Sequence, residues 1–266
     1  MSSLIMPYES SGQGTEPPIV LVPGGLTGWV SWKPHAETLS KNHRVVRVQL
    51  LNMAAAEKKR SPGKRYSLRS ETLALRNTLD NLGLQDVNLV GWSHGGEVSL
   101  DFALSCPDRI RTLALIEPAT YWVARAYGQF GNEMQAFTRL LDGFHEPPTE
   151  DDLIAFLRMN GLVPQGRDPR ELPQWPVWNS LKTALSSLHT FIEHSDDPAR
   201  LKALYGKPVL LVKGADSTGF NSGVVDLLSK TIGSSSRVLV LPDAHACHIV
   251  SKDQFIAELE RFVSAT

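Results

Sequence analysis

Six short, nearly continuous apolar runs are spread along the chain, with segments of helical periodicity between several of them. The runs occupy residues 18–24, 43–51, 86–92, 111–118, 207–214 and 236–243. A strand that is apolar throughout, rather than at every second residue, is typical of a sheet covered on both faces. Helical patterns at 67–84, 96–106 and 251–265 complete the alternation. The order predicts an α/β fold with a mostly parallel central sheet flanked by helices.

Residues 119–206 interrupt this alternation. They contain helical patterns but no convincing strand, and they are too many for a simple connection. We therefore expect residues 1–118 and 207–266 to form the α/β core and residues 119–206 to form an inserted helical cap, or lid.

Composition narrows the classes of partner. The chain has 266 residues, a formal net charge of −1 and a pI near 6.7, which gives no electrostatic reason to expect nucleic acid or a membrane. Its two cysteines, Cys106 and Cys247, are too few for a disulfide framework, and no apolar run approaches ~18 residues. We expect a soluble cytoplasmic protein that acts on a small molecule. A homodimer is compatible with the sequence.

The third apolar run ends in a Gly-x-Ser-x-Gly turn, Gly91-Trp92-Ser93-His94-Gly95, and a helical pattern follows at once. A sharp strand-to-helix turn forces its central residue into a strained conformation, and small flanking residues let the backbone pass. Ser93 would then present its hydroxyl at the carboxyl edge of the sheet, as a candidate nucleophile.

A serine nucleophile needs a histidine base that is oriented by a carboxylate. His245 and His248 both follow the last apolar run, and His245 is favoured because it lies closer to the strand. Two acids satisfy the chain order serine, acid, histidine. Glu117 ends the fourth run and Asp216 follows the fifth, so either could reach the histidine from the same sheet edge.

The run from "VLVPGGLTGW" through "GWSHGG" to "LPDAH" resembles the α/β-hydrolase fold superfamily. In most members of that superfamily the acid stands where Asp216 lies. One subclass of haloalkane dehalogenases and the zearalenone-type lactone hydrolases instead carry a glutamate after the preceding strand, at an interval from the nucleophile similar to that between Ser93 and Glu117. On this resemblance we favour Glu117 and keep Asp216 as the alternative. A dehalogenase is disfavoured because its nucleophile must be a carboxylate.

Two backbone N–H groups are expected to hold the oxyanion. His94 follows the nucleophile at the start of its helix and supplies one donor. The other comes from the loop after the first run, where the family often has His-Gly-x and this chain has Pro23, Gly24 and Gly25. Gly25 takes the third position and is the expected donor, although without the motif histidine the loop lacks one bracing side chain.

Substrate selection is expected to come from the cap, in which Trp178, Tyr121 and Trp122 are the candidate pocket walls. A cluster of basic residues in the loop at 58–65 could attract an acidic substrate, but a solvated surface is the more ordinary interpretation.

These features predict a serine hydrolase, free of cofactor and metal, that cleaves a small hydrophobic carboxylic ester or lactone through an acyl-enzyme. The same residues would also serve a carbon–carbon bond hydrolase or a cofactor-free perhydrolase. A hydrolase-like receptor that binds a ligand without rapid turnover is the alternative from another class.

Overall fold

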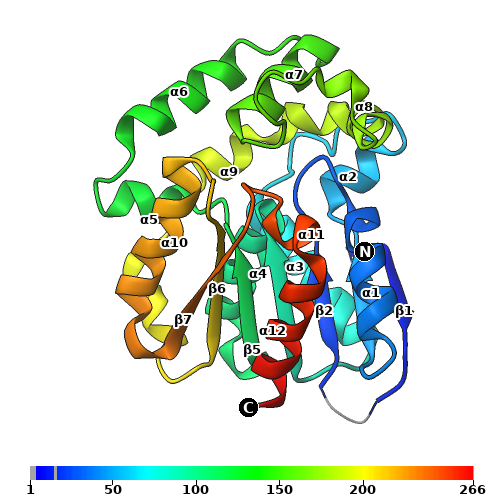
Figure 1. The fold of residues 1–266 in the computed structure, drawn as a ribbon, viewed down its shortest axis with the longest axis vertical. Helices are drawn as coiled ribbons and strands as arrows, with labels where there is room; N and C mark the ends of the chain where they lie inside the picture. Colours follow the sequence, from blue (N-terminus) through cyan, green and yellow to red (C-terminus); the bar gives the residue numbers. More distant parts are fainter. Residues whose placement is uncertain (1–3, 15–16, 266) are drawn as a thin grey trace.

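The computed structural model describes residues 4–14 and 17–265, in which seven strands form one sheet (Figure 1). Their order across the sheet is β1-β3-β2-β4-β5-β6-β7. The β1 strand runs antiparallel to β3, and every other neighbouring pair is parallel. The strands are β1 Tyr8–Ser11, β2 Ile19–Val22, β3 Val45–Val48, β4 Val87–Trp92, β5 Ile110–Ile116, β6 Val209–Gly214 and β7 Ser236–Leu241. The predicted α/β fold with a mostly parallel sheet is confirmed.

Helices cover both faces of this sheet and its upper edge in Figure 1. No helix within the described ranges has the length and apolar character needed to cross a bilayer. The α-helices are α1 Lys33–Leu39, α2 Leu51–Ala56, α3 Leu68–Asn81, α4 His94–Ser105, α5 Tyr121–Ala126, α6 Gly131–Asp142, α7 Glu150–Met159, α8 Trp175–Leu181, α9 His189–Glu193, α10 Gly219–Ile232, α11 Cys247–Val250 and α12 Lys252–Ser264. Short 3₁₀ helices lie at η1 Trp29–Trp32, η2 Pro107–Arg109, η3 Pro169–Glu171, η4 Lys182–Ser187, η5 Pro198–Leu204 and η6 Gly233–Ser235.

Each central strand is apolar throughout because its alternate residues enter two different cores. In β2, Val20 and Val22 pack into the core shared with α3, α4 and α10, whereas Ile19 and Leu21 pack into the core shared with α1 and α12. All four residues are fully buried. Two covered faces therefore explain why this strand shows no polar alternation.

The expected strand at 43–51 is wrong at its carboxyl end. β3 stops at Val48, and Leu51 is already the first residue of α2. The N–H groups of Leu51 and Asn52 donate to the Glu71 carboxylate of α3 at 2.9 and 3.2 Å, so a distant acid caps α2. The apolar run continues from the strand into a buried helix, and an apolar run alone does not distinguish a buried strand from a buried helix.

The chain between β5 and β6 contains helices α5 to α9 with η3 to η5 and no strand among the described residues. In Figure 1 these helices arch over the end of the sheet to which β5 leads. They make up most of the segment predicted as a cap, residues 119–206, and its division from the core stays a prediction.

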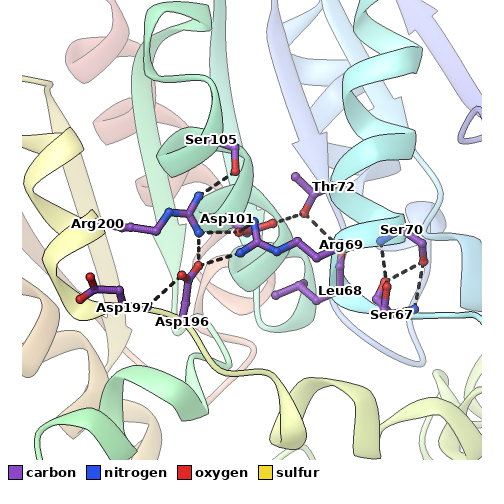
Figure 2. Close-up of polar contacts among 10 residues, drawn as sticks. All are labelled: Ser67, Leu68, Arg69, Ser70, Thr72, Asp101, Ser105, Asp196, Asp197 and Arg200. Atoms are coloured by element: carbon purple, nitrogen blue, oxygen red, sulfur yellow. Dashed lines mark hydrogen bonds and ion pairs between the residues drawn. The ribbon is translucent and has the colours of Figure 1, made fainter.

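A four-charge network holds the end of this helical segment against the core (Figure 2). Arg69 of α3 contacts Asp101 of α4 at 3.0 Å and Asp196, which follows α9, at 3.1 Å. Arg200 of η5 pairs with the same two aspartates. Because Asp101 is buried and both arginines reach it, the network fixes where the chain returns to the core.

Helix α7, in the segment predicted as a cap, begins at a capping box. The Thr149 hydroxyl accepts from the Asp152 N–H, and Asp152 Oδ2 accepts from the Thr149 N–H at 2.7 Å. Burial alone would raise the pKa of Asp152, but hydrogen bonds from Thr149 and His145 lower it from 3.8 to about 2.

Replacing this carboxylate tests the capping box. Asp152→Asn should lower the free energy of unfolding at pH 7 by about 1 kcal/mol, measured by denaturant titration. Since the pKa of Asp152 is lower in the folded protein, the stabilisation is present above pH 3.8 and is lost as the pH falls toward 2. The deficit of the variant should therefore shrink below pH 4. Asp151→Asn is the control, because its side chain is 90 % exposed. A deficit that stays constant with pH would contradict this assignment.

Candidate active site

Ser93 lies at the turn between β4 and α4 with φ 54° and ψ −118°, a positive φ that is strained for a residue with a side chain. Its N–H donates to Ile116 O at 2.9 Å, and its carbonyl accepts from the Ala119 N–H at 3.1 Å. A Cβ on Gly91 would overlap the backbone of Gly95, and one on Gly95 would overlap the carbonyl of Pro23. The two motif glycines are therefore required by close backbone packing.

Glu117 follows β5 directly and also has a positive φ, 38°. Its side chain is buried, and both carboxylate oxygens have partners. Oε1 accepts from the Gly214 N–H of β6 at 2.8 Å, and Oε2 lies 2.7 Å from His245 Nδ1. The end of the neighbouring strand thus orients this carboxylate toward the histidine.

His245 lies in the loop between β7 and α11 and is 3 % exposed. Its Nε2 is 3.0 Å from Ser93 Oγ, on the ring edge opposite to the nitrogen that faces Glu117. The Trp92 indole N–H donates to the His245 carbonyl at 2.9 Å and holds the loop against β4. The structure therefore brings together the serine, the favoured histidine and the favoured acid.

Opposing effects act on the Glu117 carboxylate. Burial alone would raise its pKa, but the hydrogen bond and charge of His245 and the Gly214 N–H outweigh burial, so the pKa lies below its usual value of 4.5. Glu117 is therefore ionised at neutral pH and suited to orient and stabilise a protonated imidazole.

The two alternative residues lie elsewhere. Asp216 is exposed after β6, where its N–H donates to Asp243 O at 3.0 Å. His248 is fully buried in α11, with its ring 4.5 Å from Trp92, and neither ring nitrogen has a hydrogen-bond partner among the described residues. Burial lowers the pKa of His248 well below 6.5. No hydrogen bond in the described chain joins Asp216 to His245 or His248 to Ser93.

Gly25 and His94, the expected oxyanion donors, lie against each other. A Cβ on Gly25 would overlap the His94 ring, which stacks on Phe191 of α9 at 4.3 Å between centroids. Burial, and then the charge of His245, lower the pKa of His94 to about 3, so its ring is neutral. Within the described ranges neither backbone N–H has an acceptor. Both remain available for an incoming oxygen.

The loop that carries Gly25 has braces that the sequence did not suggest. The Leu26 N–H donates to Met53 Sδ at 3.3 Å, and the Thr27 hydroxyl donates to Gly24 O at 3.2 Å. Met53 belongs to α2, the helix missed by the strand prediction. These contacts brace the loop, which in this chain has no motif histidine.

A model of the α/β hydrolase fold family matches residues 17–253. The chain belongs to this family. Over 106 residues it is 37 % identical to a 2-hydroxy-6-oxo-2,4-heptadienoate hydrolase of Pseudomonas putida, but that match spans only 39 % of this chain and 38 % of the relative. It is 25 % identical over 256 residues to a pimeloyl-[acyl-carrier protein] methyl ester esterase of Nitrosomonas europaea, covering 94 % of this chain and 96 % of the esterase.

Among solved structures, the fold of this α/β hydrolase resembles that of a hydrolase from Pseudomonas aeruginosa, with a TM-score of 0.78. The two are 21 % identical, and the alignment covers 96 % of this chain and 93 % of the other. This likeness shows the shared fold.

The three aromatic residues expected to line the substrate pocket of this α/β hydrolase are all buried. Tyr121, in α5, stacks between Phe137 and Phe220, with ring centroids 5.5 and 5.0 Å away. Trp122 is its neighbour in α5, and Trp178 lies in α8. Helix α5 begins near Ser93, because the Ala119 N–H donates a hydrogen bond to the Ser93 carbonyl. Tyr121 and Trp122, at the start of α5, therefore lie close to the nucleophile turn. That all three aromatic residues line the substrate pocket stays a prediction.

Four of the five basic residues at 58–65 line a surface hollow of about 790 Å³ between the N-terminal segment and α2. Neither Ser93 nor His245 lines it. The hollow is therefore separate from the candidate site of the α/β hydrolase. The cations that line it are Lys58, Arg60, Lys64 and Arg65.

One group of potential metal-ligating side chains occurs in the described part of this hydrolase, comprising Asp101, His194 and Asp196. Arg69 and Arg200 already pair with its two carboxylates. The two aspartates thus belong to the charge network of Figure 2, in which each is paired with arginine.

The close packing at the nucleophile turn can be tested with a matched pair of glycines. Gly95→Ala should lower the free energy of unfolding by about 1–3 kcal/mol, because the new methyl overlaps the Pro23 carbonyl. Gly131→Ala should leave stability unchanged or raise it by up to about 1 kcal/mol, since no atom lies within 4 Å of the added carbon. Denaturant unfolding measures both. Equal effects of the two substitutions would refute the role of Gly95.

Proposed function

We propose that this α/β hydrolase cleaves a carboxylic ester or lactone through an acyl-enzyme formed on Ser93. His245 takes the hydroxyl proton while Ser93 Oγ attacks the carbonyl carbon, and Glu117 orients the ring and balances its positive charge. The N–H groups of Gly25 and His94 donate to the developing oxyanion. His245 then protonates the leaving alcohol and later activates the water that releases the acid.

The observation that carries this proposal is the pair of distances on the two edges of the imidazole. Nε2 is 3.0 Å from the Ser93 hydroxyl and Nδ1 is 2.7 Å from the Glu117 carboxylate. Both lie within the range for hydrogen bonds that pass a proton. The ring can therefore accept a proton on one edge while the other edge remains paired.

We propose further that the substrate is uncharged and hydrophobic near the reacting bond. No lysine or arginine is buried among the described residues, whereas Glu97 and Glu117 are buried close to Ser93 in the chain and in the fold. A carboxylate brought beside them would lack a buried cation to pair with. The aromatic residues Tyr121 and Trp122 suit an apolar acyl or alcohol group.

Carbon–carbon bond hydrolysis is the second candidate, favoured by the heptadienoate hydrolase relative. The compound in that relative's name contains no ester, so its hydrolysis breaks a carbon–carbon bond. It also carries a carboxylate, which the absence of buried cations in the described chain disfavours here. Product analysis with esters and with 6-oxo-dienoates separates the two reactions. Rapid multiple turnover of a p-nitrophenyl ester would argue against a receptor.

Ser93→Ala should abolish labelling by a fluorophosphonate probe and lower the turnover of a p-nitrophenyl ester at least about 10⁴-fold. Ser99→Ala is the matched control, because Ser99 is a buried serine on the helix that follows Ser93, and its Oγ has no hydrogen-bond partner among the described residues. The control should label like the wild type. Labelling that persists in Ser93→Ala would overturn the assignment of the nucleophile.

The acid is tested by comparing Glu117→Gln with Asp216→Asn. The first should lower kcat by about 10³–10⁴-fold, because an amide cannot balance the imidazolium charge. The second should leave kcat within about threefold, because Asp216 is exposed and makes no bond to His245. Steady-state kinetics at pH 8 measure both. The reverse order of effects would make Asp216 the acid.

A further inference from the structure

Asn221 is a buried polar residue beside His245 that no sequence pattern indicated. It is the third residue of α10, and its N–H donates to Thr218 Oγ1 at 3.3 Å in the helix cap. The residue is 8 % exposed. Its carboxamide Nδ2 lies 3.2 Å from His245 Nδ1, the same nitrogen that faces Glu117.

The number of protons on His245 restricts how these three groups can bond. For Nε2 to accept the proton of Ser93, the single hydrogen of the neutral ring must be on Nδ1. Nδ1–H then points at Glu117 Oε2, and an amide N–H of Asn221 directed at the same hydrogen would repel it. Rotating the carboxamide by 180° exchanges its oxygen and nitrogen with almost no change of shape. The oxygen is the end that fits an Nδ1–H donor.

We propose that Asn221 is a positioning residue whose carboxamide oxygen shares the His245 Nδ1–H with Glu117. This inference rests on the proposed function, in which His245 is the base. The second acceptor holds the ring so that Nε2 remains directed at Ser93. It also places a dipole, rather than a charge, beside the imidazolium that forms during attack.

The neutrality of Asn221 matters for the resting state. Glu117 already supplies one full negative charge at 2.7 Å. A second carboxylate on the same nitrogen would favour the protonated ring before substrate arrives, and a protonated ring cannot accept the Ser93 proton. An amide supplies the second acceptor without that cost.

The other titratable rings near His245 do not interfere with a pH experiment. Burial, followed by the charge of His245, lowers the pKa of His94 to about 3. Burial, followed by the charges of His35 and His245, lowers the pKa of His248 well below its usual value.

Nitrogen-15 NMR of the histidine ring tests the orientation without any substrate. In the wild-type protein at pH 8, the proton should be on His245 Nδ1, and this hydrogen should give a low-field resonance coupled to the Nδ1 nitrogen. Asn221→Leu, which keeps the volume but removes the acceptor, should move that resonance. A wild-type ring protonated on Nε2, with Nδ1 bare, would overturn the proposal, and so would a resonance that does not change in Asn221→Leu.

Kinetics with a p-nitrophenyl ester then separate positioning from simple packing. Asn221→Leu should lower kcat about 3- to 10-fold with KM unchanged. Asn221→Asp should recover kcat to within about threefold at pH 9 and move the acidic limb of kcat/KM up by at least about half a pH unit. Ser222→Ala, the next residue of α10, is the control and should match the wild type. Wild-type kinetics in Asn221→Leu, or an unmoved limb in Asn221→Asp, would contradict the role.

The two proposals fail in different ways. If Ser93→Ala retains ester turnover, the proposed function is wrong, yet the ring spectrum still decides which end of Asn221 faces Nδ1. If Ser93→Ala is inactive while Asn221→Leu is kinetically and spectroscopically normal, only the role of Asn221 is wrong.

Discussion

The geometry of the candidate site depends on the buried hydrogen bond between Glu117, after β5, and His245, in the loop after β7. The carboxylate is 1 % exposed, and a buried charge is tolerated only when hydrogen bonds satisfy it. One bond comes from the Gly214 N–H at the end of β6 and the other from a loop 128 residues further along the chain. Parallel strands end at one edge, so three distant segments can converge on one side chain.

Backbone strain is concentrated at the same edge. Ser93 and Glu117 follow neighbouring strands, and both have positive φ, which costs of order 1 kcal/mol or more for a residue with a side chain. Hydrogen bonds that continue the pairing of the sheet stabilise these strained conformations. The Ser93 N–H donates to the Ile116 carbonyl, and the Glu117 N–H donates to the Val212 carbonyl. Each side chain is thereby turned out of the strand direction and toward His245. The sheet register, rather than the loops alone, sets the distance between nucleophile and acid.

Local sequence was sufficient for the central strands because their burial on both faces leaves a continuous apolar run. It was insufficient for β1, in which all four residues, Tyr8–Ser11, are exposed at the sheet edge. The sequence pattern also led us to predict a single strand across β3 and the start of α2, since both elements are buried and apolar. The family resemblance favoured Glu117, but the residues alone left Asp216 equal to it, because each follows a strand of the same sheet. Their separation depends on side-chain direction, which a linear pattern does not contain.

Asn221 and Met53 show a further limit of the sequence. An asparagine in the first turn of a helix is ordinary, and only the packing of α10 beside the β7 loop gives this one a partner in His245. Met53 resembles any core residue until its sulfur is seen to accept the Leu26 N–H. Contacts between segments far apart in sequence carry no local signature.

The balance of charge around Ser93 follows from the same burial. Glu97, one helical turn beyond Ser93, is fully buried, and neither of its oxygens has a hydrogen-bond partner among the described residues. Burial, and then the negative Asp101, raise its pKa well above 4.5, so Glu97 is held as a neutral acid. Glu117 is then the one buried carboxylate paired with His245, and in the proposed reaction the proton taken from Ser93 would neutralise that pair. A substrate with its own negative charge would disturb this balance, whereas the uncharged ester of the proposed function would develop its charge only at the oxyanion, beside the proposed donors Gly25 and His94.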